Sequence, residues 1–240
     1  MQLIEYPCKT PEELIALDEV LLLKAESGEI GETLRFWESR DLFVAVGRAC
    51  RVEEDCFRAS CADDGIKIIR RISGGGTVLQ GPGCYNYSVI LAYGENTPYK
   101  NVNSSYRSIL GGISDRLKTK GIRAEVLPLS DLAVEGLKIS GNAQARKRSF
   151  FLHHGTFLSG FDIGKVSRYL KHPLVEPEYR HGRTHDEFIG NIQISPFEIR
   201  EIIKEMFAPA GRRKPDAGEL QGMKALVDSK YSVDKWNYIF

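Results

Sequence analysis

The sequence has no CxxC pair, and its cysteines are odd in number. An odd number of cysteines argues against a disulfide framework, and a zinc ribbon needs CxxC pairs, so we expect neither in this chain. Three of the thiols fall in a helix-like stretch and are interpreted as packed side chains, which predicts a reducing compartment and hence a cytoplasmic protein. The five cysteines are Cys8, Cys50, Cys56, Cys61 and Cys84.

Other features are also missing. No apolar run approaches the roughly 18 residues of a membrane-spanning helix, and residues 1–6 lack the basic and apolar regions of a signal peptide. The 33 lysines and arginines are balanced by 32 acidic residues, which leaves a net charge of +1. We therefore expect neither nucleic acid nor a membrane as a partner. No repeat with a period of 20 to 50 residues occurs.

Mixed helical and alternating patterns are present instead, and hairpins outnumber βαβ crossovers. They predict an α+β fold with a mixed, largely antiparallel sheet and packed helices. Residues 172–192 and 211–215 are predicted to be loops. Helices are expected at 11–25, 52–63, 99–118, 162–170, 196–207 and 216–229, and strands at 33–37, 42–46, 66–70, 85–91, 122–127, 131–134, 137–139 and 150–158.

The first stretch with chemical potential joins two cations to three glycines. Arg70 ends a predicted strand and Arg71 follows it, and Gly74, Gly75 and Gly76 come shortly after them. A glycine run is useful where the main chain must approach a ligand closely or adopt positive φ. With two cations beside it, the simplest ligand is an anion, although most glycine runs only mark turns.

The second stretch carries a lysine in a predicted hairpin. Residues 131–134 and 137–139 flank the turn Glu135-Gly136. On a regular strand Lys138 would face opposite to Leu137 and Ile139. Taken alone, it is most simply a lysine on the wet face of a sheet.

Together, three ordered blocks resemble the signatures of the lipoate–protein ligase family, within the wider biotin/lipoate ligase group. The blocks are RRISGGGTVLQGPGCYNYS, SDLAVEGLKISGNAQ and FLHHGTFL, and the resemblance extends over about residues 12 to 238. It implies that residues 1–240 form a single catalytic domain of the biotin/lipoate ligase type. It also implies an ATP- and Mg²⁺-dependent ligase that converts lipoate or octanoate to the acyl-adenylate. The acyl group would then pass to a lysine of a lipoyl carrier domain, in a 2-oxoacid dehydrogenase E2 protein or the glycine cleavage H protein.

Such a reaction needs main-chain N–H donors and a fixed cation around the α-phosphate. The resemblance implies that Lys138 is the catalytic lysine, bridging acid and phosphate, with Asp131 as a magnesium or phosphate-end ligand. A histidine on a buried strand is also often a core residue. Two interpretations of His154 therefore remain open: a ligand contact, and a packed core side chain with its hydrogen bonds satisfied. The implied ATP or acyl contacts are Arg71, Ser73, Gly74, Gly75, Gly76, Thr77, Val78, Leu79, Asp131, Ser140, Gly141 and His154.

The sequence departs from the family pattern in three places. Gln80 stands where a histidine is usual, and Cys84 where an asparagine is usual; both border the expected pocket and leave the acyl preference open. Many relatives also carry a C-terminal accessory domain, which some receive as a separate polypeptide. We therefore expect a catalytic subunit that takes a partner chain, or else a single-domain enzyme.

An alternative is an octanoyl or lipoyl acyltransferase that works through a cysteine thioester without ATP. Residues 80–83 resemble an octanoyltransferase motif, and Cys84 follows them directly. One transferase branch places its cysteine in the region that matches residues 127–131, where this chain has none. A non-catalytic acyl-binding module remains a third interpretation, which would not need both the glycine block and Lys138. A biotin ligase is disfavoured because its GRGRxGR-type loop is absent.

Overall fold

A computed structural model describes residues 1–95, 97–128 and 130–240. Its helices are α1 (Pro11–Glu26), α2 (Val52–Asp55), α3 (Arg58–Asp63), α4 (Val102–Thr119), α5 (Val166–Tyr169), α6 (His185–Phe188), α7 (Pro196–Phe207), α8 (Ala217–Leu226) and α9 (Asp234–Asn237). Its strands are β1 (Gln2–Ile4), β2 (Thr33–Trp37), β3 (Phe43–Val46), β4 (Lys67–Arg70), β5 (Val78–Gln80), β6 (Cys84–Ala92), β7 (Glu125–Leu127), β8 (Asp131–Val134), β9 (Leu137–Arg146), β10 (Phe150–Leu158) and β11 (Gly211–Arg213). Short 3₁₀ turns cover 98–100, 163–165 and 178–180, and a π-helical turn covers 227–231.

The strands form two sheets. Among the described residues, the larger has the order β11-β1-β2-β6-β10-β9-β8-β7 and the smaller the order β4-β3-β5. Pairing is parallel between β1 and both of its neighbours and between β3 and β4, and antiparallel elsewhere. The α+β class with a mixed, largely antiparallel sheet is therefore confirmed.

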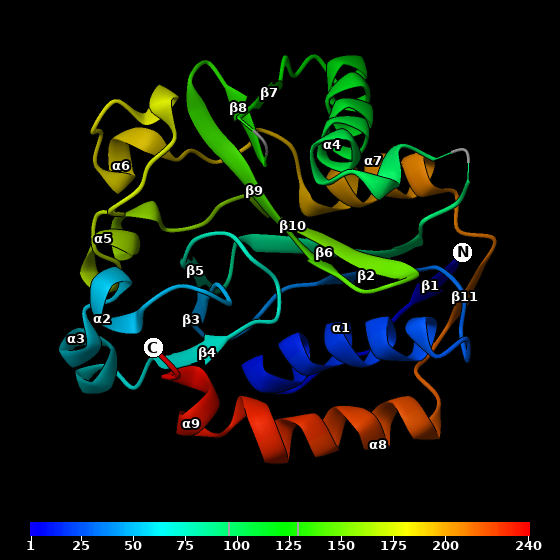
Figure 1. Ribbon diagram of the computed structural model, residues 1–240. Coiled ribbons are helices and arrows are strands. Elements are labelled where there is room, and N and C mark those ends of the chain that lie inside the picture. The colour runs from blue at the N-terminus through cyan, green and yellow to red at the C-terminus, as the bar shows by residue number, and fades with distance from the viewer. Residues whose placement is uncertain (96, 129) are drawn as a thin grey trace.

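The large sheet is covered on both faces, as Figure 1 shows: α4 and α7 lie on one side, and α1 and α8 lie side by side on the other. Strand β6 shows how the sequence assigns these faces. Val89 and Leu91 belong to the core under α4 and α7, whereas Ile90 belongs to the core under α1. Successive side chains of a strand point to opposite faces, so a strand buried on both sides is apolar throughout.

The sequences of residues 10–13 and 195–198 both predict a capping box at a helix start, and only the second box forms completely. Ser195 at the start of α7 forms the complete reciprocal capping box that the sequence predicts. At the start of α1, the Thr10 hydroxyl accepts from the Glu13 N–H at 3.3 Å. The Glu13 carboxylate, however, accepts from the N–H of Lys9 at 2.6 Å rather than from Thr10. The predicted box is therefore only half formed.

Several predicted elements differ in detail. The helix expected over 52–63 is broken into α2 and α3, since Cys56 and Phe57 leave the helical conformation and Cys56 pairs with Leu170 instead. The predicted loop 172–192 contains α6 and a 3₁₀ turn, and the predicted loop 211–215 supplies β11. The neighbouring strands β2 and β3 lie in different sheets. The break at Cys56 and the strand β11 depend on partners far away in the chain, whereas α6 begins with a local capping box between Thr184 and Glu187.

Candidate functional site

Lys138 reaches the same face of the sheet as Gly141 because the β8–β9 pairing contains a bulge. Ala133 faces Lys138 and Leu132 faces Ser140, so β9 has one additional residue at this point. In a regular strand Lys138 and Gly141, three positions apart, would point to opposite faces. A bulge changes that parity. A Cβ built on Gly141 would lie 2.9 Å from Lys138 Cε and 3.1 Å from its Nζ, so the lysine side chain folds down over this glycine.

Asp131 holds the lysine in this position. Its Oδ1 lies 2.8 Å from Lys138 Nζ, and the aspartate side chain is 5% exposed against 27% for the lysine. The Tyr179 hydroxyl donates to the other carboxylate oxygen, Oδ2, at 2.8 Å. Because Asp131 is directly opposite Gly141 in the sheet, both charged groups lie on one face at the β8–β9 edge.

The glycine loop lies against the same strand. The Gly74 N–H donates to the Gln144 carbonyl at 3.2 Å, and a Cβ on Gly75 would lie 3.6 Å from Ala143 Cβ. Ala143 is two residues from Gly141, which corresponds to about 7 Å along a strand. The loop and the Lys138 ammonium, predicted from distant stretches, are therefore brought to one part of one sheet face.

Arg71 is buried and bonded to the loop itself. Its Nη2 donates to the carbonyls of Gly74 and Gly76 at 2.7 and 2.8 Å, its Nη1 to Ala45 O at 3.0 Å, and its Nε to Ser73 Oγ at 2.9 Å. Burial lowers the pKa of Arg71 to about 10, so the guanidinium remains charged at neutral pH. The phosphate or carboxylate clamp expected of Arg71 remains a prediction, and these contacts give it an additional part in shaping the loop.

The direction of these carbonyls fixes the direction of the neighbouring N–H groups. In a trans peptide the C=O of one residue and the N–H of the next point in opposite directions. With the carbonyls of Gly74 and Gly76 aimed at Arg71, the N–H groups of Gly75 and Thr77 point away from it. Within the described chain these two groups donate to no protein acceptor, which is the arrangement of a main-chain anion cradle.

Arg70 does not face a ligand. It is fully buried, and its guanidinium donates to the carbonyls of Gly47, Cys50 and Asn237, among others, at 2.7 to 3.0 Å. The inference that two cations beside the glycines both await an anion is therefore wrong for Arg70. This residue joins β4 to the C-terminal α9 instead.

His154 and Ser73 form a close pair under the loop. Ser73 Oγ lies 2.6 Å from His154 Nε2 and also accepts from Arg71. Burial, with smaller contributions from the charges of Arg71 and His153, holds the pKa of His154 well below its ordinary value, so the imidazole is neutral. His154 lies on the β10 face that carries the loop, and its contact with an acyl or nucleotide group remains a prediction.

His153 points to the opposite face, as the strand period predicts. Its ring nitrogens lie 3.0 Å from Tyr87 Oη and 3.1 Å from Gln144 Nε2, and Tyr87 also donates to Asn142 Oδ1 at 2.7 Å. Burial lowers the pKa of His153 to about 3. This histidine is a satisfied core residue beneath the strand that carries Lys138.

Four further predicted site residues, at positions 77, 78, 79 and 140, lie in the small sheet, beside it or in β9. The Thr77 hydroxyl donates to the Asp55 carboxylate, and Val78 begins β5. The Leu79 side chain is packed in the core of the small sheet, and Ser140 is buried and accepts from Asn142 Nδ2 at 3.3 Å. The side chains of Leu79 and Ser140 therefore have structural partners, and their contact with a ligand remains a prediction.

Gln80 and Cys84, the two residues that differ from the family pattern beside the expected pocket, are both buried. Gln80 is buried and bonded to Thr156 Oγ1 at 2.8 Å and to Asn86 Nδ2 at 3.0 Å, on the face that carries His154. Cys84 is completely buried, its thiol is 3.7 Å from the Leu79 carbonyl, and burial raises its pKa to about 12. A thiol in that position is protonated and shielded, which disfavours it as a nucleophile.

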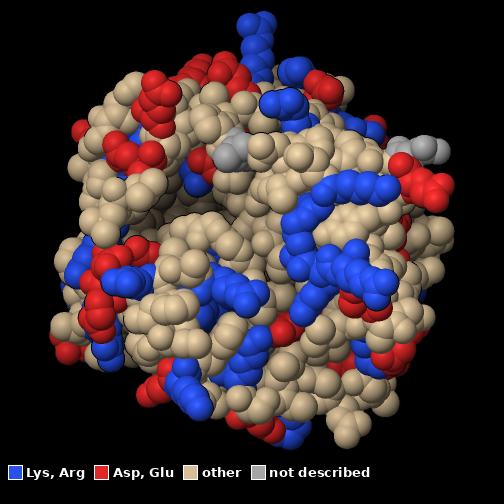
Figure 2. Space-filling view, viewed as in Figure 1, with Lys and Arg blue, Asp and Glu red and all other residues tan. Residues whose placement is uncertain are grey.

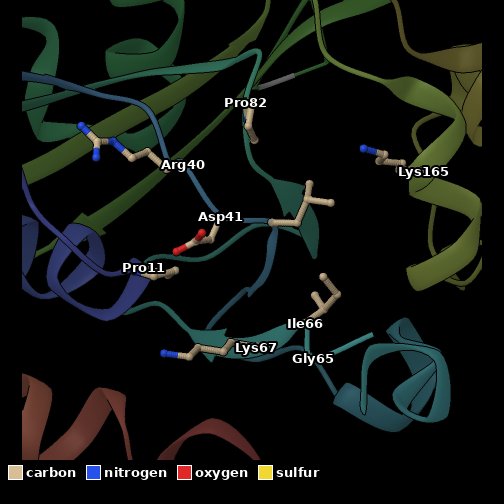
Figure 3. A pocket seen from close by; sticks show the side chains of 9 residues that line it. Pro11, Arg40, Asp41, Gly65, Ile66, Lys67, Pro82 and Lys165 are labelled. Atoms are coloured by element: carbon tan, nitrogen blue, oxygen red, sulfur yellow. The ribbon is translucent and has the colours of Figure 1, made fainter. Parts of the chain in front are cut away.

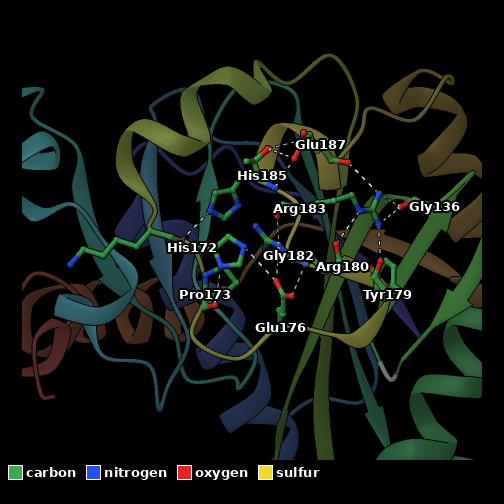
Figure 4. Close-up of polar contacts among 12 residues, drawn as sticks. Gly136, His172, Pro173, Glu176, Tyr179, Arg180, Gly182, Arg183, His185 and Glu187 are labelled. Carbon is green, nitrogen blue, oxygen red and sulfur yellow. Dashed lines mark hydrogen bonds and ion pairs between the residues drawn. The ribbon is translucent and has the colours of Figure 1, made fainter.

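The segment 172–192 is tied to the hairpin that carries Lys138, a relation not foreseen from the sequence. The Arg183 guanidinium donates twice to the Gly136 carbonyl at 3.1 Å, and it also reaches the Tyr179 carbonyl at 2.8 Å (Figure 4). Arg180 and His172 both pair with Glu176 inside the segment. No local periodicity marks Tyr179, because its role depends on a contact 48 residues away in sequence.

Figure 2 shows that the molecule is hollowed on the face seen in Figure 1, between α6, β9 and β5, where the glycine loop and the β8–β9 hairpin meet. A separate cavity of about 540 Å³ lies beside the small sheet. Figure 3 shows that Arg40, Lys67 and Lys165 come to this cavity from different elements. None of its lining residues belongs to the predicted site.

The described residues contain no cluster of three or more His, Cys, Asp or Glu side chains arranged to hold a metal ion. Asp131 is the carboxylate beside Lys138 on the sheet face that carries the glycine loop, and one carboxylate with substrate phosphates is a common way to bind Mg²⁺. The site therefore fits a metal that arrives with a nucleotide. Among the described helices, none has the length and hydropathy required to cross a membrane.

Comparison with known proteins gives relatives of two activities. A probable lipoate-protein ligase A of Mycoplasma pneumoniae is 30% identical over 65% of this chain and 44% of its own length, so this chain matches less than half of that protein. An octanoyltransferase LipM of Kyrpidia tusciae is 26% identical over 93% of both chains.

Solved structures agree on the fold. A bi-partite lipoate protein ligase from Thermoplasma acidophilum, studied with its E2 lipoyl domain, superposes with a TM-score of 0.82 at 24% identity, over 99% of this chain and 95% of its own. A lipoate-protein ligase A bound with ATP gives 0.83 at 23% identity, over 99% and 98%. The profile of the lipoyl protein ligase A/B catalytic domain matches residues 10–208, and the chain therefore belongs to that family.

Proposed function

We propose that this protein is an ATP-dependent lipoate–protein ligase. The carboxylate oxygen of lipoate or octanoate attacks the α-phosphorus of ATP and releases pyrophosphate. The amino group of a carrier lysine then attacks the acyl carbon and releases AMP. The lipoate ligases and octanoyltransferases among the relatives support acyl transfer to a carrier, and a related ligase has been solved with ATP.

The observation that carries the proposal is the convergence of Lys138 and the glycine loop on one sheet face. Charge accumulates on the phosphoryl oxygens as the acyl-adenylate forms. The Lys138 ammonium neutralises it from the β9 side, and the N–H groups of Gly75 and Thr77 donate from the loop. Binding of the acid exchanges the Asp131 partner of Lys138 for the substrate carboxylate and phosphate.

Several residues position these groups. Arg71 holds the loop carbonyls away from the ligand, and the neutral His154 fixes Ser73 beneath the loop. Mg²⁺ reduces the charge of the phosphates when it is bound, and Asp131 is the residue we assign to it. Lipoyl carrier domains, of an E2 protein or an H protein, are the proposed acceptors, and a separate accessory subunit is a further proposed partner.

Pyrophosphate exchange into ATP, dependent on lipoate, tests the ligase directly. We expect the wild-type protein to catalyse exchange and Lys138→Ala to lose it by a factor of about 10² to 10³, the usual effect of removing one preorganised charge stabiliser. Lys235→Ala, on α9, is the matched control and keeps full exchange. Full exchange by Lys138→Ala would disprove the mechanism.

The octanoyltransferases among the relatives favour a second candidate, transfer through a cysteine thioester. A thiolate would attack the donor acyl thioester, release the donor thiol, and then lose the acyl group to the acceptor lysine. Cys84 is poorly suited, whereas the Cys50 thiol lies 3.4 Å from the Gly75 carbonyl at the edge of the loop. An acyl-enzyme detected by mass spectrometry without ATP, and lost in Cys50→Ser or Cys84→Ser, would establish this route.

A further inference from the structure

Four cations gather at the far end of the β9–β10 hairpin, outside the site described above. They are Lys100, Arg146, Lys147 and Arg148, and we name them the hairpin basic patch. They line a cavity of about 770 Å³ together with aromatic side chains that include Tyr93. Figure 2 shows Lys and Arg side chains concentrated over this end of the hairpin. The net charge of the whole chain is only +1, so the patch reflects an uneven distribution of charge.

The patch has no acidic partner of its own. Among the described ion pairs, none includes Lys100, Arg146, Lys147 or Arg148. Two carboxylates lie nearby: Glu32 accepts from the Ala92 N–H at 3.2 Å, and Glu26 accepts from the backbone N–H groups of residues 148, 149 and 150 at 3.0 to 3.2 Å. The charge of Glu26 therefore fixes the hairpin turn, and the side chains of Lys147 and Arg148 remain exposed.

Arg146 makes the patch rigid. Its guanidinium lies 4.7 Å from the ring centre of Tyr93 and 4.8 Å from that of Phe151. It also donates to Gln144 Oε1 at 2.8 Å and to the Lys100 carbonyl at 3.1 Å. These contacts fix the Arg146 guanidinium before any partner binds. The loss of side-chain entropy on binding is therefore smaller than for a mobile arginine.

The end of the β9–β10 hairpin and the hollow of the site are both visible in the view of Figure 2, although the Arg146 side chain packs on Phe151, on the sheet face opposite to Lys138. Arg146 follows Lys138 by eight residues on β9, which corresponds to roughly 26 Å for an extended strand. A domain of about 100 residues has a radius of gyration of about 13 Å and is roughly 30 Å across. A protein that places a lysine at the adenylate is therefore large enough to reach the patch at the same time.

We propose that the hairpin basic patch docks an acidic surface of the carrier domain that presents the acceptor lysine. Unpaired surface cations attract and orient an oppositely charged partner, and they act mainly on association rate and salt dependence. The inference rests on the proposed function in one respect: the acceptor is a protein domain that approaches the site. It does not depend on whether the acyl group comes from an adenylate or a thioester.

The test is a titration of a fluorescently labelled apo E2 lipoyl domain of Thermoplasma acidophilum by fluorescence anisotropy. The patch variant is Lys147→Glu/Arg148→Glu. The matched control is Lys214→Glu/Lys235→Glu, which changes the net charge equally at two exposed lysines without a described ion pair. All proteins are compared at low and high salt, and circular dichroism verifies their folding.

We expect the patch variant to raise the dissociation constant at low salt by about tenfold, and high salt to remove most of that difference. The control should bind as the wild type does. Equal binding by wild type and patch variant, an equal loss in the control, or no binding by the wild type would overturn the proposal. So would tighter, competing binding of a single-stranded oligonucleotide.

Lipoate-dependent pyrophosphate exchange, measured on the same proteins, separates this inference from the proposed function. Exchange should be unchanged in the patch variant, because no carrier takes part in that half-reaction. If the wild type shows no exchange, the ligase proposal fails, while the binding data still decide the role of the patch.

Discussion

At the scale of single residues, Gly141 controls how closely the Lys138 ammonium approaches the sheet. A methyl group at position 141 would lie within 3.1 Å of both the last carbon and the nitrogen of the lysine. The obstructing atoms are the far end of a flexible side chain, and Gly141 has no positive φ. The fold can therefore accept alanine here, although the ammonium must move.

We predict that Gly141→Ala lowers lipoate-dependent pyrophosphate exchange at least tenfold and changes the free energy of unfolding by less than about 1 kcal/mol. Gly111→Ala is the control, since a Cβ there would meet nothing within 4 Å; α4 should be slightly stabilised and activity retained. An active Gly141→Ala enzyme would show that the position of Lys138 over this glycine is unimportant.

His153 predicts a pH dependence of stability. Its pKa is about 3 in the folded protein and near 6.5 when unfolded. Between these values the unfolded chain binds a proton that the folded protein does not, so the free energy of unfolding falls as pH falls. The slope from this one group is at most about 1.4 kcal/mol per pH unit, and it vanishes above pH 6.5.

His153→Gln should therefore flatten the profile between pH 6.5 and 4.5, measured by urea unfolding at each pH. Val89→Ala is the control, because a non-titrating cavity variant should lower stability by a similar amount at every pH. A His153→Gln profile parallel to the wild type would mean that the imidazole already binds its proton in the fold.

At the scale of elements, the β9 bulge and the segment 172–192 assemble the site. The bulge brings Lys138 to the loop face, and the segment is attached to the same hairpin through Arg183 and Tyr179. The Tyr179 hydroxyl donates to an Asp131 carboxylate oxygen that a phosphate-bound metal would need as a ligand. We therefore expect the Tyr179–Asp131 hydrogen bond to break when ligand binds.

Tyr179→Phe removes the hydroxyl and keeps the ring that packs on Phe188. We predict faster amide hydrogen exchange in residues 176–183 of the ligand-free protein, and no change in the small sheet. Tyr238→Phe, near the C-terminus, is the comparison and should leave that segment unaffected. Unchanged exchange in Tyr179→Phe would show that the Arg183 contacts alone hold the segment.

At the scale of the whole molecule, we propose that residues 1–240 form a single domain. Helix α1 packs against α8 and against β10 of the large sheet, and Arg70 joins the small sheet to α9. Contacts of this kind leave no boundary at which the chain divides into independent cores.

We predict one cooperative unfolding transition in urea, with tryptophan fluorescence and far-ultraviolet circular dichroism changing together. Both tryptophans, Trp37 at the end of β2 and Trp236 in α9, pack on the core under α1, so their fluorescence reports on tertiary packing whereas circular dichroism reports on secondary structure. Separate midpoints for the two signals would contradict the single-domain proposal.

The sequence was sufficient for the class of fold, the family, the β8–β9 hairpin and the opposite directions of His153 and His154, because these follow from periods of two and 3.6 residues and from ordered motifs. It was misleading for Arg70 and for the segment 172–192. A cation beside glycines looks the same whether it binds a ligand or a backbone carbonyl.

By itself, then, the amino-acid sequence determined which elements form and which chemical groups are available. Tertiary structure alone decided that Lys138 and the glycine loop share a sheet face, that Arg70 is structural, and that Tyr179 closes on Asp131. The physical reason is that strand parity depends on a bulge in the pairing, and the partner of a buried charge depends on contacts between segments far apart in the chain.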